Sequence, residues 1–341
     1  MDMIQTLSTL AAAFGPSGGE KAVADVIAEL ARPYCHDIRQ DVMGNLFCHR
    51  KGKGPKLMFA AHMDSIGLVV THIEEKGVLR VGTVGGVPLS KVLYAPVRFQ
   101  NGRMGTVGVD EGTELARLKL SHLFVDIGAA SREEAEGLIH VGDMAVYGGQ
   151  TFEAQGRMVS PYMDNRISCL VLLMAMEAMG PAGEEEENDL YFVFTTQEEV
   201  GCRGAKPAAW SISPDYGIAV DVTRADCEMG SKHGGSSVLG GGAAVKVMDQ
   251  SVICHPQMVE KLMALAAAHN IKAQRDVITA GGTDAGPMHM NGVGVYTGGI
   301  SIPCRYIHTP TEMVDRGDVQ ACAQLVAAFA KAPHEKECEV G

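Results

Sequence analysis

Apolar and polar positions recur along the chain with two different periods, which divide it into helices and strands. Residues 1–14 predict an amphipathic helix that stops at the breaker run of residues 15–19. A second helix is expected over residues 20–31. Residues 57–61 are apolar on both faces, as in a central strand covered by helices, and this strand runs straight into His62.

Residues 67–156 follow a different pattern. They form short alternating segments separated by glycine-rich turns. One short helix is expected over residues 131–138, because this stretch begins with the capping sequence Ser-Arg-Glu-Glu. This pattern predicts a small, mostly β unit inserted into a larger domain. The expected organisation is a discontinuous main domain, residues 1–66 and 157–341, around an insert of residues 67–156.

The α/β pattern returns after the insert. Helices are expected over residues 166–179, 255–270 and 319–331, and strands over residues 190–195, 217–220 and 294–300. Together with the N-terminal elements, these segments predict an α/β fold in which a mixed central sheet is flanked by helices.

The charge balance and the cysteines narrow the class of protein. With 29 Lys and Arg against 41 Asp and Glu, the formal net charge is −12, the wrong sign for binding the phosphate backbone of nucleic acid. The nine cysteines are scattered and form no Cys-x-x-Cys pair, so neither a disulfide framework nor a thiolate zinc site is expected. Since no signal peptide and no apolar run of about 18 residues occurs, we expect no membrane association and a cytoplasmic protein.

Histidine and acidic residues follow three of the predicted strands. His62 and Asp64 come directly after one buried strand, Glu198 and Glu199 come shortly after another, and Asp221 directly follows a third. In open α/β sheets, ligands bind outside the carboxyl ends of the strands. We therefore expect these side chains to meet at one edge of the sheet.

Two further residues complete a candidate metal site. Asp164 lies at the predicted start of a helix, where alone it would be an ordinary N-cap, and His308 lies in a loop. Two histidines and three carboxylates can form two metal sites that share one ligand, and this mixture suits zinc, cobalt or manganese. Two such ions can promote hydrolysis if one further carboxylate acts as the general base, and adjacent Glu198 and Glu199 can divide the roles of base and ligand.

Six short motifs in a fixed order extend this hypothesis. They are residues 61–67 (Ala-His-Met-Asp-Ser-Ile-Gly), 163–166 (Met-Asp-Asn-Arg), 196–201 (Thr-Gln-Glu-Glu-Val-Gly), 219–223 (Ala-Val-Asp-Val-Thr), 281–286 (Gly-Gly-Thr-Asp-Ala-Gly) and 301–310 (Ser-Ile-Pro-Cys-Arg-Tyr-Ile-His-Thr-Pro). Together with residues 126–129 of the insert, the chain resembles the M42 family of metallo-aminopeptidases, the group of glutamyl aminopeptidases and TET peptidases. The resemblance covers essentially the whole chain.

This resemblance implies metal-ligand roles for particular residues. His62 and Asp221 would hold one metal ion. Glu199 and His308 would hold the other, and Asp164 would bridge the two ions. Two divalent ions per subunit are expected, with zinc as the expected ion and cobalt or manganese as alternatives.

The resemblance also implies the reaction and the assembly. The protein would remove N-terminal residues from short peptides by means of a metal-bridged water, with Glu198 as the general base. Asp64 would hydrogen-bond the other ring nitrogen of His62 and fix its tautomer. The fold would be zinc-exopeptidase-like with a cis Asp164–Asn165 peptide bond. The insert would be a β-barrel or PDZ-like assembly domain, in a homo-oligomer of twelve subunits.

Two other hypotheses compete with this one. A glycosidase could use Glu198 and Asp64 as an acid/base pair, but carbohydrate sites usually carry stacking aromatic side chains and Trp210 is the single tryptophan. A catalytically idle binding protein would require a lost ligand or base, and none is missing from the sequence.

The preferred N-terminal residue of the substrate stays open at this stage. A preference for acidic residues would require a cation in the pocket, for which Arg224, Lys232 and Arg305 are candidates. Ser65 stands where the family usually has Glu, a departure that leaves the ligand positions untouched. The loop of residues 281–286 either lines the site or is a plain turn.

Overall fold

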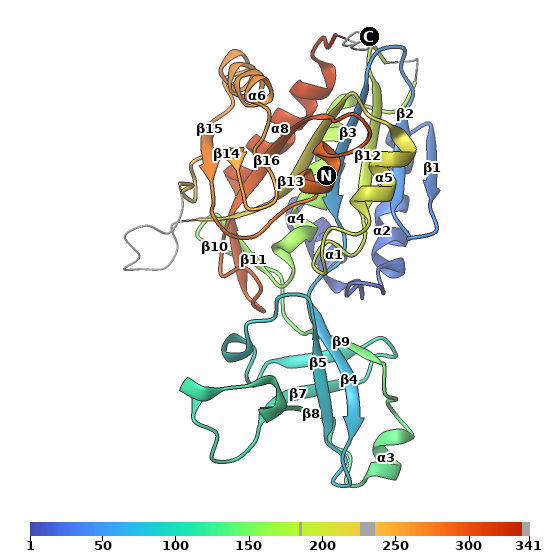
Figure 1. Ribbon diagram of the computed structural model, residues 1–341, viewed down its shortest axis with the longest axis vertical. Helices are drawn as coiled ribbons and strands as arrows, with labels where there is room; N and C mark the ends of the chain where they lie inside the picture. Colours follow the sequence, from blue (N-terminus) through green and yellow to red (C-terminus); the bar gives the residue numbers. More distant parts are fainter. Residues whose placement is uncertain (184–185, 226–235, 336–341) are drawn as a thin grey trace.

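The computed structural model describes residues 1–183, 186–225 and 236–335. A large sheet with its helices forms the upper part of the molecule in Figure 1, and a small barrel of strands lies below it. Among the described residues, no helix is both long enough and apolar enough to cross a bilayer.

The large sheet is mixed. Its strands lie in the order β1 (Asp37–Gln40), β2 (Leu46–Arg50), β12 (Asp189–Thr195), β3 (Lys56–His62), β13 (Tyr216–Arg224), β16 (Tyr296–Arg305), β17 (Glu312–Asp315), β11 (Arg157–Ser160) and β10 (Phe152–Ala154), while β14 (Ala243–Met248) pairs with β16 and with β15 (Ala273–Val277). The central strands β12, β3, β13 and β16 are parallel, so their carboxyl ends share one edge.

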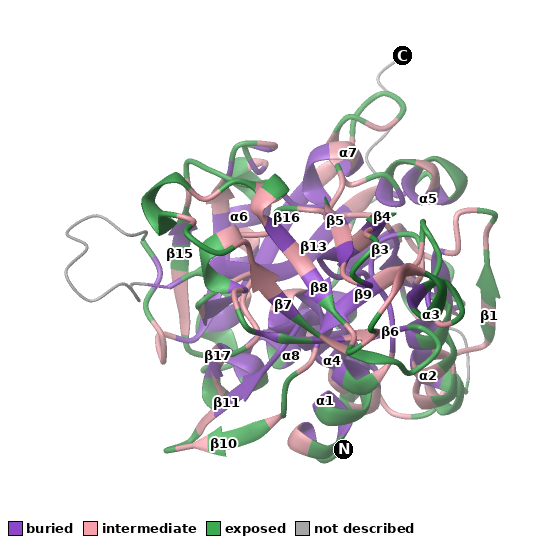
Figure 2. Cartoon of the chain, turned by 90° about the horizontal axis from the view of Figure 1, so that it is seen from below, coloured by how far each residue is buried: buried purple, intermediate pink, exposed green. Residues whose placement is uncertain are grey.

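Helices cover both faces of this sheet, which explains why the central strands are apolar on both sides. One layer is formed by α1 (Met3–Ala12), α2 (Lys21–Ala31), α4 (Met163–Met179), α6 (Pro256–Ala268) and α8 (Arg316–Lys331). The other face carries α5 (Ala205–Ile212) and α7 (Ala285–His289), which contact each other. Figure 2 shows α1, α4 and α8 on one side of the sheet and α5 and α7 on the other.

The most buried helix, α4, lies against β3 and β13 at the centre of the main hydrophobic core. It is apolar nearly all round because α1, α2 and α8 cover the sides that the sheet does not. Residues that follow β3 and β13 are therefore held by a tightly packed layer.

The second unit is a closed barrel with its own core. Its strands are β4 (Gly67–Ile73), β5 (Leu79–Val84), β8 (Leu123–Asp126), β7 (Met104–Val109), β6 (Pro96–Phe99) and β9 (Met144–Tyr147), and α3 (Arg132–Glu136) packs beside β4. Short 3₁₀ turns are Arg32–Tyr34, Leu89–Lys91, Leu115–Arg117 and Leu120–His122. Although Phe152–Ala154 falls inside the range suggested for the insert, this strand pairs with β11 in the large sheet.

The structure confirms the mixed α/β fold with a small β unit and adds elements that the pattern did not reveal. These are β10, β11, β14, β15, β17, α5 and α7. Most of them are short, and their few residues carry too little periodicity to distinguish them from loops. Two predicted strands are longer than expected: β13 extends to Arg224 and β16 extends to Arg305.

Candidate metal centre

The carboxyl ends of the parallel strands bring most of the predicted residues together. His62 ends β3 and pairs with Thr195, which ends β12, and the chain then reaches Glu198 and Glu199. His308 lies just beyond the end of β16, the fourth parallel strand. The sequence predicted that this strand would end at residue 300, well before His308. The site therefore forms at the edge where ligands bind in open α/β sheets.

Asp221 lies inside β13, so the prediction that it directly follows a strand was wrong. The strand continues beside β16 as far as Arg224, but its pairing with β3 ends at Ala219. Asp221 therefore occupies the part of β13 that β3 no longer pairs with, and its side chain can reach His62, Nε2 to Oδ1 3.7 Å.

Asp164 does not cap the helix, although its position near the start of α4 suggested that ordinary role. The N-cap is Tyr162, Asp164 itself has non-helical φ and ψ, and the Asp164–Asn165 peptide bond is cis, as predicted. Its carboxylate lies between the two histidines. Oδ1 is 3.0 Å from Nε2 of His62 and Oδ2 is 3.2 Å from Nε2 of His308.

The side chains fall into two groups of three that share Asp164. The potential ligand atoms of each group lie within 4.8 Å of one another, and the groups are His62, Asp164 and Asp221, and Asp164, Glu199 and His308. In the second group, Nε2 of His308 is also 3.2 Å from Oε2 of Glu199. The grouping is the one that the family resemblance implies.

Both histidines present the same ring nitrogen to the centre. Nδ1 of His308 lies 2.8 Å from the carbonyl oxygen of Gly86, and Nδ1 of His62 lies 3.3 Å from the carbonyl oxygen of Asp64 and 3.4 Å from its Oδ1. Because these oxygens can only accept, each Nδ1 donates, and Nε2 of the neutral ring is left with a lone pair for a ligand. Gly86 belongs to the loop after β5 of the barrel, so the small unit helps to orient a residue of the large one.

The centre concentrates buried negative charge. Burial, followed by the charge of Asp164, raises the pKa of Glu199 to about 7, and burial also raises the pKa of Glu198 and of Asp221. Burial alone would lower the pKa of His308, but its hydrogen bonds to Asp164 and Glu199 outweigh this and raise that pKa to about 12. These buried carboxylates strongly favour a positive charge beside them, as a cation-binding site requires.

Asp64 is fully buried and does more than the sequence predicted. Besides lying against the His62 ring, it accepts hydrogen bonds from the backbone N–H of Glu198 at 3.0 Å, from that of Glu199 at 3.2 Å and from the hydroxyl of Ser17 at 2.6 Å. It therefore positions both strand-end glutamates as well as the histidine.

Two residues near the centre escaped the sequence prediction. Cys202 donates its thiol hydrogen to Oε1 of Glu198 at 3.1 Å, and the buried carboxyl of Asp284 is hydrogen-bonded by the hydroxyl of Thr195. Both lie in or beside the motifs given above, but a thiol three positions after Glu199 and an acidic residue in a glycine-rich loop carry no distinctive signal. Only the folded chain brings Cys202 to Glu198 and Asp284 to Thr195 at the end of β12.

The centre opens into a cavity of about 760 Å³. Its wall includes both metal-ligand groups, Glu198, Cys202 and the loop of residues 277–283, so the glycine-rich loop does line the site. Of the candidate cations, Arg224 lines the cavity, Arg305 is not among the lining residues, and Lys232 lies outside the described residues. This volume suits the end of a peptide.

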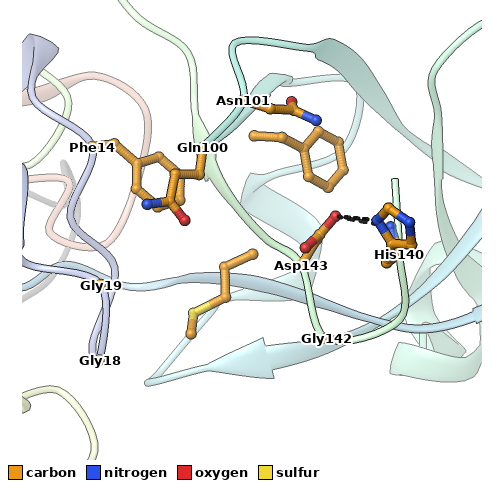
Figure 3. A pocket seen from close by; sticks show the side chains of 10 residues that line it. Phe14, Gly18, Gly19, Gln100, Asn101, His140, Gly142 and Asp143 are labelled. Atoms are coloured by element: carbon orange, nitrogen blue, oxygen red, sulfur yellow. Dashed lines mark hydrogen bonds and ion pairs between the residues drawn. The ribbon is translucent and has the colours of Figure 1, made fainter. Parts of the chain in front are cut away.

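A second, smaller cavity of about 410 Å³ lies where the N-terminal segment meets the barrel. Figure 3 shows Phe14 and Gln100 on one side of it and the ion pair of His140 with Asp143 on the other. Neither His140 nor Asp143 belongs to a group of potential metal ligands within the described residues. Both groups of potential metal ligands instead line the larger cavity.

The family model of M42 glutamyl aminopeptidase matches residues 44–325, a range that contains all seven predicted site residues. The chain belongs to the M42 peptidase family. A putative aminopeptidase of Acetivibrio thermocellus is 41% identical over 326 residues, which cover 95% of this chain and 97% of that protein.

Solved structures agree with this assignment. An aminopeptidase of the archaeon Desulfurococcus kamchatkensis is 40% identical with a TM-score of 0.91, covering 96% of this chain and 94% of the other. The TET1 peptidase of Pyrococcus horikoshii, which can assemble into a tetrahedron or a large octahedral shell, is 29% identical with a TM-score of 0.86, covering 96% and 99%. This M42 peptidase is accordingly a peptide hydrolase, a metal-dependent aminopeptidase.

Proposed function

We propose that this M42 peptidase is a dinuclear enzyme that removes N-terminal residues from short peptides, with Glu198 as the general base. The observation that supports this most directly is the placement of Asp164, whose two carboxylate oxygens each face a different histidine within two overlapping ligand groups. A carboxylate in this position can serve two ions at once, which is the arrangement of two-metal hydrolases.

The donor atoms fit a pair of divalent transition-metal ions. Each group combines one imidazole Nε2 with two carboxylates, a mixture that suits zinc, cobalt or manganese. Oε1 of Glu199 is buried without a hydrogen-bond partner, as expected for an oxygen that faces an ion. We propose that His62 and Asp221 hold one ion, that Glu199 and His308 hold the other, and that Asp164 bridges them.

Ions bound there would supply Lewis-acid polarisation of the scissile carbonyl and of the attacking water. Glu198 belongs to neither ligand group but lines the same cavity, and its Oε2 lies 3.7 Å from Nε2 of His62. With Oε1 held by the thiol of Cys202, Oε2 is the oxygen that accepts the proton from the attacking water and returns it to the leaving amine.

The cavity favours a peptide over a carbohydrate. Among the described residues, its lining contains no tryptophan, tyrosine or phenylalanine on which a sugar ring could stack, and Trp210 lies on α5, 75% exposed and away from this lining. One short peptide end, held by its amino group beside the carboxylates, fits the enclosed space.

We further propose that residues 1–66 and 157–341 form the catalytic domain and that residues 67–156 form an assembly domain of a cytoplasmic homo-oligomer. The barrel exposes large apolar side chains at Tyr94, Met104 and Leu115, which contacts between subunits would cover. A closed tetrahedral shell like that of the Pyrococcus relative would contain twelve subunits. The molar mass from light scattering tests this part directly.

Metal removal and reconstitution test the catalytic proposal. Protein stripped with a chelator should lose the release of N-terminal residues from a panel of short peptides. Adding zinc, cobalt or manganese should restore activity together with two bound ions per subunit. Full activity in demonstrably metal-free protein, or cleavage of cellulose in a parallel assay without cleavage of peptides, would contradict the proposal.

A further inference from the structure

Glu312, which neither the sequence pattern nor the ligand groups single out, lies behind the metal centre. It is the first residue of β17 and only 2% exposed. Oε2 accepts a hydrogen bond from the backbone N–H of Asp164 at 2.8 Å, and Oε1 accepts one from the backbone N–H of His308 at 2.6 Å. One buried carboxylate thus joins the main chains of two residues of the centre.

The sheet explains why Glu312 can make both contacts. β17 lies between β11, which leads to Asp164, and β16, which leads to His308 (Figure 2). Glu312 pairs with Ser160 at the end of β11, so its side chain starts from the strand that separates the two approaching segments. The register of β17 therefore places Glu312 between the two segments that carry Asp164 and His308.

Both hydrogen bonds to Glu312 come from backbone N–H groups in irregular segments of the chain. Asp164 has non-helical φ and ψ within the first turn of α4, and His308 has a φ of 64°, in the left-handed region. In such segments the orientation of the side chain depends on what fixes the main chain. Glu312 fixes it at both positions, and the side chains then meet with Oδ2 of Asp164 3.2 Å from Nε2 of His308.

We propose that Glu312 is a positioning residue of the metal centre, which sets the separation of Asp164 and His308 so that both can hold one ion. The inference rests on the proposed dinuclear function. Glu312 does not line the cavity and is not in either ligand group, so it acts through the two residues whose amides it holds. Replacing a residue that hydrogen-bonds a metal ligand typically lowers metal affinity by about 10–100-fold.

Asp318 offers a matched control within the same chain. It is 1% exposed on α8, and its carboxylate likewise accepts two backbone N–H groups, from Gly240 at 2.7 Å and from Gly242 at 2.6 Å. Asp318 does not line the metal-site cavity. Glu312→Gln and Asp318→Asn therefore make the same chemical change, replacing one acceptor oxygen by an NH₂ group that faces a main-chain N–H.

The experiment titrates chelator-stripped wild type and both variants with Co²⁺ against a competing chelator, and records the Co²⁺ absorption spectrum and the thermal midpoint of each stripped protein. Glu312→Gln should weaken the affinity for one ion by about 10–100-fold and change the spectrum. Asp318→Asn should lower the thermal midpoint while leaving metal affinity and spectrum unchanged. Glu312→Asp, which keeps both carboxyl oxygens but draws them back by one methylene, should fall between wild type and Glu312→Gln.

The outcomes separate the two proposals. Wild-type protein that binds no divalent ion overturns the dinuclear function and this inference with it. Wild type that binds two ions, with unchanged affinity in Glu312→Gln, overturns only the role of Glu312. An equal loss of metal affinity in Asp318→Asn also overturns it, because the effect is then general destabilisation. If Glu312→Gln does not fold, unchanged metal affinity in Glu312→Asp decides against the inference.

Discussion

Replacing Glu198 by Gln removes the proposed base with little change in shape. The amide oxygen of Gln can take the place of Oε1 and accept the thiol hydrogen of Cys202, which is 3.1 Å away in the native protein. The amide nitrogen then takes the place of Oε2, the oxygen that lies 3.7 Å from Nε2 of His62. Because an amide cannot accept a proton at neutral pH, Glu198→Gln isolates proton transfer from metal binding.

The expected magnitude follows from the part that Glu198 plays. General-base catalysis contributes about 10²–10⁴-fold, or roughly 3–5 kcal/mol of transition-state stabilisation. The five proposed ligands are unchanged, so the variant should still bind two ions. Since Glu198 acts on the attacking water, kcat should fall by this factor while KM changes little.

The assay measures kcat and KM for release of the N-terminal residue, together with bound metal per subunit. Glu199→Gln serves as the contrasting neighbour, because loss of a proposed ligand should reduce the metal content as well as the rate. A Glu198→Gln variant that carries a full complement of metal and turns over at the wild-type rate would show that Glu198 is not the base.

Three further predictions concern the same centre. Protons and metal ions compete for Glu199, whose pKa is about 7, and for His308, whose pKa is about 12. The apparent metal affinity should therefore fall as the pH is lowered from about 8 to 6, and metal binding should release protons. Calorimetric titration in buffers of different ionisation enthalpy measures this release, and its absence would contradict the ligand assignment. Asp64→Asn should weaken metal binding by about 10–100-fold in a chelator competition, because the backbone of Glu198 or Glu199 loses an acceptor; unchanged affinity would refute the positioning role. Cys202→Leu should lower kcat by about 2–10-fold, as expected for one lost hydrogen bond, whereas Cys202→Ser should retain most of the rate; equal rates in the two variants would rule the contact out.

Much of the fold was predictable because its central elements carry strong local patterns. The strand ending at His62 is apolar on both faces, and α4 has a long apolar run, so their existence and type follow from burial between two layers. By contrast, α7 and β17 are too short for a period to appear, and the extent of β13 depends on pairing with β16 rather than on its own residues.

The candidate site was predictable to the same degree. Glu198 and Glu199 follow a buried strand, and the rule that parallel strands end at a common edge was enough to bring them to His62. Cys202, Glu312 and Asp284 were not predictable, because a single polar residue in a turn or a short strand has no periodicity that marks its partner. Their contacts exist only after distant segments have packed.

The sequence by itself determined which chemistry the protein can offer: two histidines and several carboxylates at the ends of elements, in the order typical of the M42 family. Only the tertiary structure decided that the two oxygens of Asp164 face different histidines and that Gly86 of the barrel orients His308. The physical reason is that local patterns report which face of an element is buried, whereas the separation of side chains far apart in sequence depends on strand order, register and the packing of one unit against another.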